Sequence, residues 1–308
     1  MMKTLSGIAM MASLIHSCLL AAQPTAMMPI PERIVAQRGG FIPEGIEYDN
    51  LYNRFLTGSI ADGSIYAIGT DGSLHVVVDD PELEASVGIE VDEQRNRLLV
   101  ANASIEAAEG GASLGVYQLN TGQRLAMIDL AGVIPDRPAD ASHFANDVAV
   151  SRFGEIYVTD TRMNIIYKVD NYYRASVFLD LGRDSGLNIN GIEYHPNGYL
   201  LVVSPGTGQL LRIPVNDPES WSFVDLELPA TGGDGLVWAA DGSLAVVSNN
   251  LGRVTKYSSD DFWLSAGVSG LASFDGQGTT GATVGNYIYV VQPHFADPEP
   301  PVILRAEF

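Results

Sequence analysis

The chain has 308 residues, 46% of them hydrophobic, and its 37 acidic residues outnumber 17 basic ones, which gives a net charge of −20 at pH 7. The acidic residues are spread along the chain, which disfavours nucleic acids and anionic membranes as partners. The single cysteine, Cys18, lies near the N-terminus. Disulfides, zinc–thiolate sites and cysteine nucleophiles are therefore excluded from the rest of the chain.

The N-terminal segment "MMKTLSGIAMMASLIHSCLLAAQ" has the pattern of a secretory signal peptide. Lys3 precedes an apolar run that ends at the small residues Ala21 and Ala22, and the run is short for a membrane span. We predict a signal peptide over residues 1–22, cleaved near 22–26, and one domain over residues 30–308 of a secreted or periplasmic protein. A buried N-terminal helix and a lipoprotein signal that uses Cys18 are the alternatives.

A sixfold repeat organises the remainder of the chain. Its copies are 43, 59, 44, 44 and 46 residues apart. The long second interval carries its extra residues in "ASIEAAEGGAS" and "AGVIPDRPADASHFA", which are polar and marked by Gly or Pro and so predict loops. The string "GIEY" and its weaker variants begin at Gly45, Gly88, Asp147, Gly191, Gly235 and Gly281.

Short runs rich in Val, Ile and Tyr follow each copy, separated by "DG", "NG" or "TG", a pattern typical of β-hairpins. The second runs begin at Arg54, Arg97, Glu155, Tyr199, Ser243 and Tyr287. The third runs are "SIYAI", "LGVYQL", "IIYKV", "QLLRI", "RVTKY" and "VILRAEF". The fourth runs are "LHVVVD", "RLAMIDL", "ASVFLD", "SFVDLEL" and, more weakly, "VSGLAS".

The sixth copy has no fourth run after it, but "RIVAQ" at Arg33 to Gln37 precedes the first copy and can fill that place. Four strands per copy, six copies and a closing N-terminal strand predict an all-β, six-bladed β-propeller with four-stranded blades. A parallel sheet covered by helices would need amphipathic patterns of about 10–15 residues between the strands, and the sequence has none.

The residue before each repeat start is the most informative position. The first strand of each propeller blade lines the central channel, so these six side chains converge on one axis. Most of them carry carboxylate or carboxamide oxygens, the hard donors that Ca²⁺ prefers, although turn capping is the alternative for each one alone. In chain order the ring positions are Glu44, Val87, Asn146, Asn190, Asp234 and Thr280.

The sequence resembles the calcium-dependent lactonases and phosphotriesterases of the SMP-30, gluconolactonase and luciferin-regenerating-enzyme family. The resemblance runs from "PEGIEYD" through "ANDVAVSRFGEIYVTDT" and "NGIEYHPNGYLLVVS" to "GDGLVWAADGSLAVV". It implies a six-bladed propeller with one catalytic Ca²⁺, or another divalent metal, held by Glu44, Asn146, Asn190 and Asp234. It also implies that Asp234 is the nucleophile or the general base, without choosing between these roles.

Two departures from the family bear on the substrate. Val87 stands where paraoxonase-like relatives place a histidine, and Phe144 stands where sugar lactonases carry an arginine. Phe144 therefore predicts a more apolar substrate. Val87 and Thr280 mark the blades that should leave the site open.

Three further side chains are candidates for the site. His143 lies three residues before Asn146, where it could shuttle a proton, and a surface loop histidine is the alternative. Trp238 follows Asp234 on the inner strand, and His294 follows the second run of the last copy. We expect both to line the substrate pocket.

These observations predict an exported, monomeric, Ca²⁺-dependent hydrolase. Its substrate would be a small lactone or related ester of apolar character. Two alternatives remain open, because a fold does not fix a function. The first is a propeller that keeps the metal but binds a ligand or a protein without turnover, and the second is an enzyme of a non-hydrolytic biosynthetic reaction.

Overall fold

The computed structural model describes residues 30–105, 110–134, 141–296 and 299–308. The predicted signal segment 1–22 and its cleavage region lie outside the described residues. Residues Pro31–Phe308 form one compact unit. Within the described ranges, no helix combines the length and the apolar character that crossing a membrane requires.

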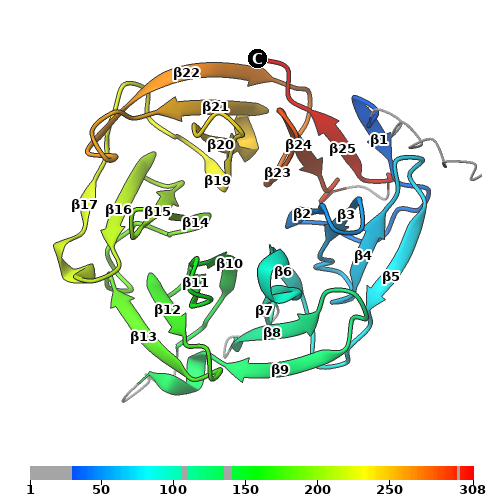
Figure 1. Cartoon of the computed structure of the whole chain (residues 1–308), viewed down its shortest axis with the longest axis horizontal. Coiled ribbons are helices and arrows are strands. Elements are labelled where there is room, and N and C mark those ends of the chain that lie inside the picture. Colours follow the sequence, from blue (N-terminus) through cyan, green and yellow to red (C-terminus); the bar gives the residue numbers. More distant parts are fainter. Residues whose placement is uncertain (1–29, 106–109, 135–140, 297–298) are drawn as a thin grey trace, which may run out of the picture. The chain divides into compact units, whose positions relative to one another are not determined.

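Six β-sheets surround a central channel, each with its first strand innermost (Figure 1). The predicted six-bladed propeller is confirmed. The inner strands are β2 (Ile46–Asp49), β6 (Ser86–Asp92), β10 (Ala145–Val150), β14 (Ile192–His195), β19 (Gly233–Trp238) and β23 (Gly281–Val284). The second strands are β3 (Arg54–Thr57), β7 (Arg97–Ala103), β11 (Ile156–Asp160), β15 (Tyr199–Ser204), β20 (Leu244–Ser248) and β24 (Tyr287–Gln292).

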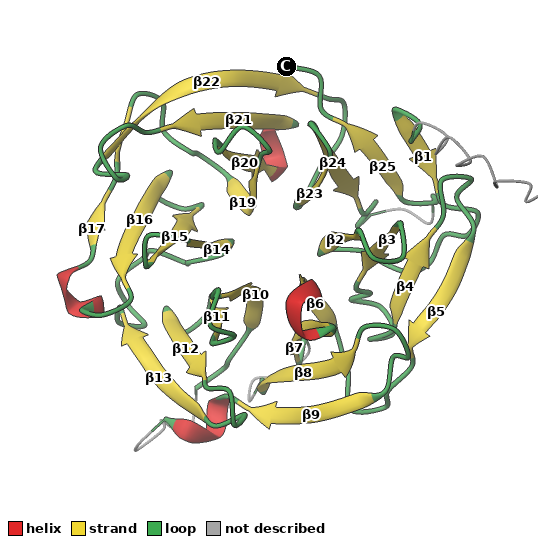
Figure 2. Ribbon diagram, in the orientation of Figure 1, coloured by secondary structure: helices red, strands yellow, loops and turns green. Residues whose placement is uncertain are grey.

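The third strands are β4 (Ile65–Ile68), β8 (Ala112–Gln118), β12 (Ile165–Val169), β16 (Gln209–Pro214), β21 (Arg253–Ser258) and β25 (Val302–Arg305). The outer strands are β5 (Leu74–Val78), β9 (Arg124–Asp129), β13 (Ala175–Asp180), β17 (Ser222–Phe223), β22 (Ser265–Ser273) and β1 (Arg33–Val35). Short 3₁₀ helices interrupt the loops (Figure 2): η1 (Glu93–Arg95), η2 (Ala131–Val133), η3 (Pro218–Ser220) and η4 (Asn249–Leu251).

The ring closes as predicted. Strand β1 pairs antiparallel with β25, with Ile34 opposite Ile303, so the N-terminal strand completes the last blade (Figure 1). Closure of this kind leaves few exposed sheet edges.

One blade departs from the four-strand prediction. The run "SFVDLEL" splits, because β17 pairs with β16 in blade four whereas β18 (Asp225–Leu226) pairs in parallel with β22 in blade five. Blade five is therefore a five-stranded sheet. The run predicted more weakly, "VSGLAS", lies within the nine-residue strand β22.

The hydrophobic core is divided among the interfaces between neighbouring blades. One cluster joins Leu56 of blade one to Leu98 of blade two, and another joins Tyr157 of blade three to Leu200 of blade four. Tyr66, Tyr157, Tyr167 and Tyr289 are all buried, so these tyrosines pack within the propeller.

The repeated glycine marks a close approach between blades. A Cβ on Gly45 would lie 2.5 Å from the Val87 carbonyl oxygen, and one on Gly191 would lie 2.5 Å from that of Asp234. The amide of each glycine also donates to the same carbonyl oxygen. Each glycine thus lets its inner strand touch the next, which brings the preceding ring residues together.

Candidate metal centre

A β-bulge sets the direction of the ring residue in three blades. Asp234 and Gly235 of β19 lie opposite a single residue of β20, Val247. The same irregularity includes Asn146 in β10 and Val87 in β6. Bulges re-aim side chains and are frequent beside active sites, so the local backbone turns these side chains out of the regular alternation.

Two amide groups hold the Asp234 carboxyl. Its Oδ1 accepts a hydrogen bond from Asn190 Nδ2 at 2.7 Å, and its Oδ2 accepts one from Asn249 Nδ2 at 2.8 Å. Burial raises the pKa of Asp234 to about 6, and the two amide hydrogen bonds oppose that rise. Burial, followed by the charges of Asp234 and Asp147, also raises the pKa of Glu44 well above its usual range. Glu44 and Asp234 are thus close enough to repel each other.

The Thr161 hydroxyl links Asn146 to the backbone that precedes Asn190. Asn146 Nδ2 donates to Thr161 Oγ1 at 2.8 Å, and Thr161 donates to the carbonyl oxygen of Ile189 at 2.7 Å. Ile189 immediately precedes Asn190. In the described part of the chain, no hydrogen bond uses Oδ1 of either asparagine, so both amide carbonyl oxygens remain for a ligand.

This donor set fits a hard divalent cation. It combines two carboxylates with two amide carbonyls. Groups of three or more His, Cys, Asp or Glu side chains that could hold a metal do not occur among the described residues, so a site of this kind would depend on the asparagines. Such oxygen donors suit Ca²⁺ rather than zinc. A cation between Glu44 and Asp234 would also offset their repulsion.

Sequence reasoning missed Asp147 and Asn249. Asp147 occupies a repeat-start position that is glycine in the other copies, and its carboxylate accepts from the amides of Val148 at 2.9 Å and Ile192 at 3.0 Å. Burial raises its pKa to about 7. The departure from glycine was the available signal for Asp147, and no motif marked Asn249.

The residues predicted to open the site are closely packed. Val87 is buried, and Thr280 lies against the space where Gly235 would carry a Cβ. The Phe144 ring lies 5.0 Å from the Arg162 guanidinium. The positive charge of Arg162 therefore lies beside Phe144, the residue that stands where sugar lactonases carry an arginine.

His143 is fully buried, which excludes the surface loop alternative. Its Nδ1 lies 2.7 Å from Oδ2 of the buried Asp160, and the Tyr167 hydroxyl donates to the same Oδ2 at 3.0 Å. Its Nε2 has no hydrogen-bond partner among the described residues. A proton-shuttle role for His143 stays a prediction.

Trp238 and His294 line two separate cavities. Trp238 ends β19, and it lines a cavity of about 380 Å³ with Glu47, Glu90 and Glu193 of three other inner strands. Burial raises the pKa of all three glutamates well above the usual range, and their mutual repulsion adds to the rise. His294 lines a separate cavity of about 210 Å³ with residues of two loops, including Asp275 and Phe295.

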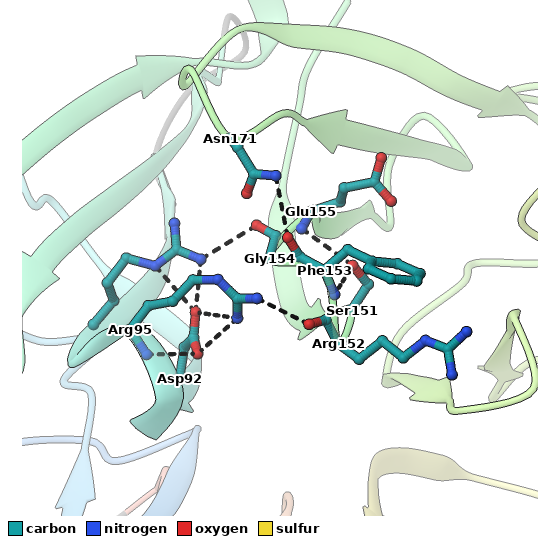
Figure 3. A network of polar contacts seen from close by, with 9 residues as sticks. Asp92, Arg95, Ser151, Arg152, Phe153, Gly154, Glu155 and Asn171 are labelled. Atoms are coloured by element: carbon teal, nitrogen blue, oxygen red, sulfur yellow. Dashed lines mark hydrogen bonds and ion pairs between the residues drawn. The ribbon is translucent and has the colours of Figure 1, made fainter.

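Two arginines of blade two, ion-paired with Asp92, hydrogen-bond to the backbone of blade three beside the glutamate-lined cavity (Figure 3). The buried Asp92 accepts from Arg97 at 2.6 Å and from Arg95 at 3.2 Å. Arg95 then donates to the carbonyl oxygen of Arg152 at 2.9 Å, and Arg97 donates to that of Gly154 at 3.2 Å. This network holds the two blades together at that end of the channel.

No protein-family model and no curated protein sequence matches the chain. Solved structures do match. The major allergen Mala s 1 of Malassezia sympodialis is 16% identical, with a TM-score of 0.75 over 90% of this chain and 96% of its own. Regucalcin, a calcium-binding protein from Agrobacterium tumefaciens, is 16% identical, with a TM-score of 0.63 over 90% and 95%. Virginiamycin B lyase from Staphylococcus aureus is 9% identical, with a TM-score of 0.60 over 89% and 98%.

The chain has the fold of these proteins. The resemblance to the SMP-30, gluconolactonase and luciferin-regenerating-enzyme propellers is confirmed as a likeness of fold. At these identities the similarity extends to the fold alone, and the same fold serves a calcium-binding protein, a lyase and an allergen.

Proposed function

We propose that the protein is an exported, Ca²⁺-dependent hydrolase of small lactones or related esters. One observation carries the proposal: Asp234 is clamped by Asn190 and Asn249, and its charge raises the pKa of the neighbouring Glu44. Two carboxyls that repel each other, together with amide carbonyl oxygens, are the donors that Ca²⁺ prefers.

Glu44, Asn146, Asn190 and Asp234 would hold the ion. When bound, the ion would supply Lewis acidity toward the carbonyl oxygen of an ester. Asp234 carries out the chain's own part of the reaction, as the nucleophile or as the base that takes a proton from water. Asn190 and Asn249 keep its carboxylate in one orientation during that step.

The apolar character of the proposed substrate rests on Phe144. Phe144 presents an aromatic ring near Asn146, with Arg162 stacked on it. A substrate with an acyl or aromatic group would contact this ring, whereas a polyol would lose hydrogen bonds there.

A panel of lactones and aryl esters, assayed with and without a chelator, tests the proposal. The wild type should hydrolyse some of them, and both the chelator and Asp234→Asn should abolish that activity. Turnover that resists both treatments would refute the metal-dependent mechanism. A complete lack of turnover across the panel would refute the hydrolase.

A non-hydrolytic reaction at the same metal site is the second candidate, and the fold similarity to a lyase favours it. Reaction in ¹⁸O-labelled water separates the two. Hydrolysis places one labelled oxygen in the acid product, whereas an elimination or a rearrangement places none.

A further inference from the structure

The three bulged blades share a second feature, a residue at the end of the second strand or directly after it whose amide donates to the residue two positions before the ring residue. The amide of Thr161 donates to the carbonyl oxygen of Phe144 at 3.1 Å, and the amide of Asn249 donates to that of Gly232 at 3.0 Å. Phe144 and Gly232 each lie two positions before a ring residue. In blade two the amide of Ala103 makes the same contact with Ala85 at 3.1 Å. Thr161, Asn249 and Ala103 therefore occupy equivalent places.

The side chain at this place changes with the ring residue of its own blade. Asn146 donates to Thr161, and Asp234 accepts from Asn249, each over 2.8 Å. The apolar Val87 is accompanied by Ala103, which has no side-chain donor or acceptor. A polar ring residue thus has a polar supporting residue, and the apolar one does not.

The hydrogen bonds leave each polar pair with one orientation. The single hydroxyl hydrogen of Thr161 is donated to Ile189, so its oxygen can only accept from Asn146. The Asn146 amide must therefore direct its nitrogen toward Thr161 and its carbonyl oxygen away from it. Asn249 and Asn190 likewise occupy one oxygen each of the Asp234 carboxyl, which restricts its rotation.

We propose that Thr161 and Asn249 are positioning residues of the ring, with Thr161 fixing the amide of Asn146 and Asn249 fixing the carboxylate of Asp234. The consequences for metal binding and catalysis rest on the proposed function. Loss of residues that orient metal ligands typically costs about 10- to 100-fold in metal affinity or activity. The same range applies here because each contact constrains a proposed ligand directly.

Titration calorimetry with Ca²⁺ tests the threonine. Thr161→Val keeps the shape but removes the hydroxyl, and it should weaken Ca²⁺ binding by about 10- to 100-fold. Thr161→Ser keeps the hydroxyl and should bind within a few-fold of the wild type. Equal binding by the valine and serine variants would overturn the role of Thr161.

Steady-state kinetics test the asparagine. Asn249→Ala should lower kcat by about 10- to 100-fold while KM changes by less, because the contact orients the reacting carboxylate rather than the bound substrate. Asn250→Ala is the matched control. Asn250 is exposed and lies on the same helix η4, and its one side-chain hydrogen bond among the described residues is with Gln277. Equal kcat in both variants would overturn the role of Asn249.

Crystal structures of the metal-free variants separate this inference from the proposed function. Asn249→Ala should release Asp234 into another side-chain rotamer, and Thr161→Val should turn the Asn146 amide, whereas Asn250→Ala should change neither. An unmoved Asp234 and Asn146 would overturn the positioning roles whatever the protein catalyses. A wild type that neither binds Ca²⁺ nor hydrolyses esters would refute the proposed function, while the crystal structures would still decide the positioning.

Discussion

The metal-free protein should lose stability as the pH rises from acid to neutral, because the channel buries carboxyls that favour their protons. Burial raises the pKa of Asp147 from its ordinary 3.8 to about 7. For an acid with a raised folded pKa, the stabilising contribution is complete below the unfolded pKa and is lost as the pH rises toward the folded one. A shift of about 3 units at about 1.4 kcal/mol each gives a loss of about 4 kcal/mol between about pH 4 and pH 7.

Urea denaturation with a chelator, repeated across this pH range, measures the effect. Asp147→Asn cannot ionise and should flatten the profile by about 4 kcal/mol. Its absolute stability is not the test, because the amide also replaces one hydrogen-bond acceptor of the carboxylate. Asp184→Asn, which changes an exposed carboxyl by the same charge, should leave the wild-type profile unchanged. A free energy of unfolding that stays level or rises toward neutral pH in the wild type would refute the reasoning.

Three further outcomes follow from the packing. Glu193→Gln should raise the melting temperature at neutral pH, because it removes a carboxyl whose burial and neighbours raise its pKa, whereas a fall would show that its charge is stabilising. Gly191→Ala should lower the free energy of unfolding by about 1–3 kcal/mol or more, because the added methyl group meets the next inner strand. Gly111→Ala should lower it little, because nothing lies within 4 Å of the added Cβ. Equal losses in the two variants would contradict this. Arg97→Ala should cost about 1–3 kcal/mol, because it removes two hydrogen bonds from the buried Asp92 and leaves its carboxylate only Arg95. The exposed Arg174→Ala should cost about 1 kcal/mol or less, and thermal and chemical unfolding measure both.

Much of the structure could be predicted from the repeat, because equivalent positions of the repeats lie at equivalent places around the propeller axis. The position one residue before each repeat start predicts that Asn190 and Asp234 lie together, and a hydrogen bond joins them in the structure. The same register does not extend along the strand to Trp238, whose place in a substrate pocket stays a prediction. Four residues of extended strand span about 13 Å, so Trp238 reaches the glutamate-lined cavity beyond the ring.

Contacts between strands were harder to predict than positions along them. Thr161 and Asn249 belong to loops after the second strands, and their reach to the ring depends on a bulge that pairs two residues with one. A run of alternating residues does not reveal such a bulge. Likewise, the division of "SFVDLEL" between two blades depends on which neighbour offers a free edge.

The repeat start itself shows how one position serves both packing and charge. Glycine is required at Gly45 and Gly191 because the next inner strand lies too close for a side chain. Blade three has Asp147 instead, and its carboxylate accepts the amide of Ile192 where the glycine blades donate to a carbonyl oxygen. The Thr159 hydroxyl replaces the backbone contact between the blades, because it accepts from the Asp147 amide at 3.1 Å and donates to the Asn190 carbonyl oxygen at 2.8 Å. Asp147 also adds a partly buried acid whose charge raises the pKa of Glu44. Blade three therefore couples the stability of the ring to the protonation of the channel.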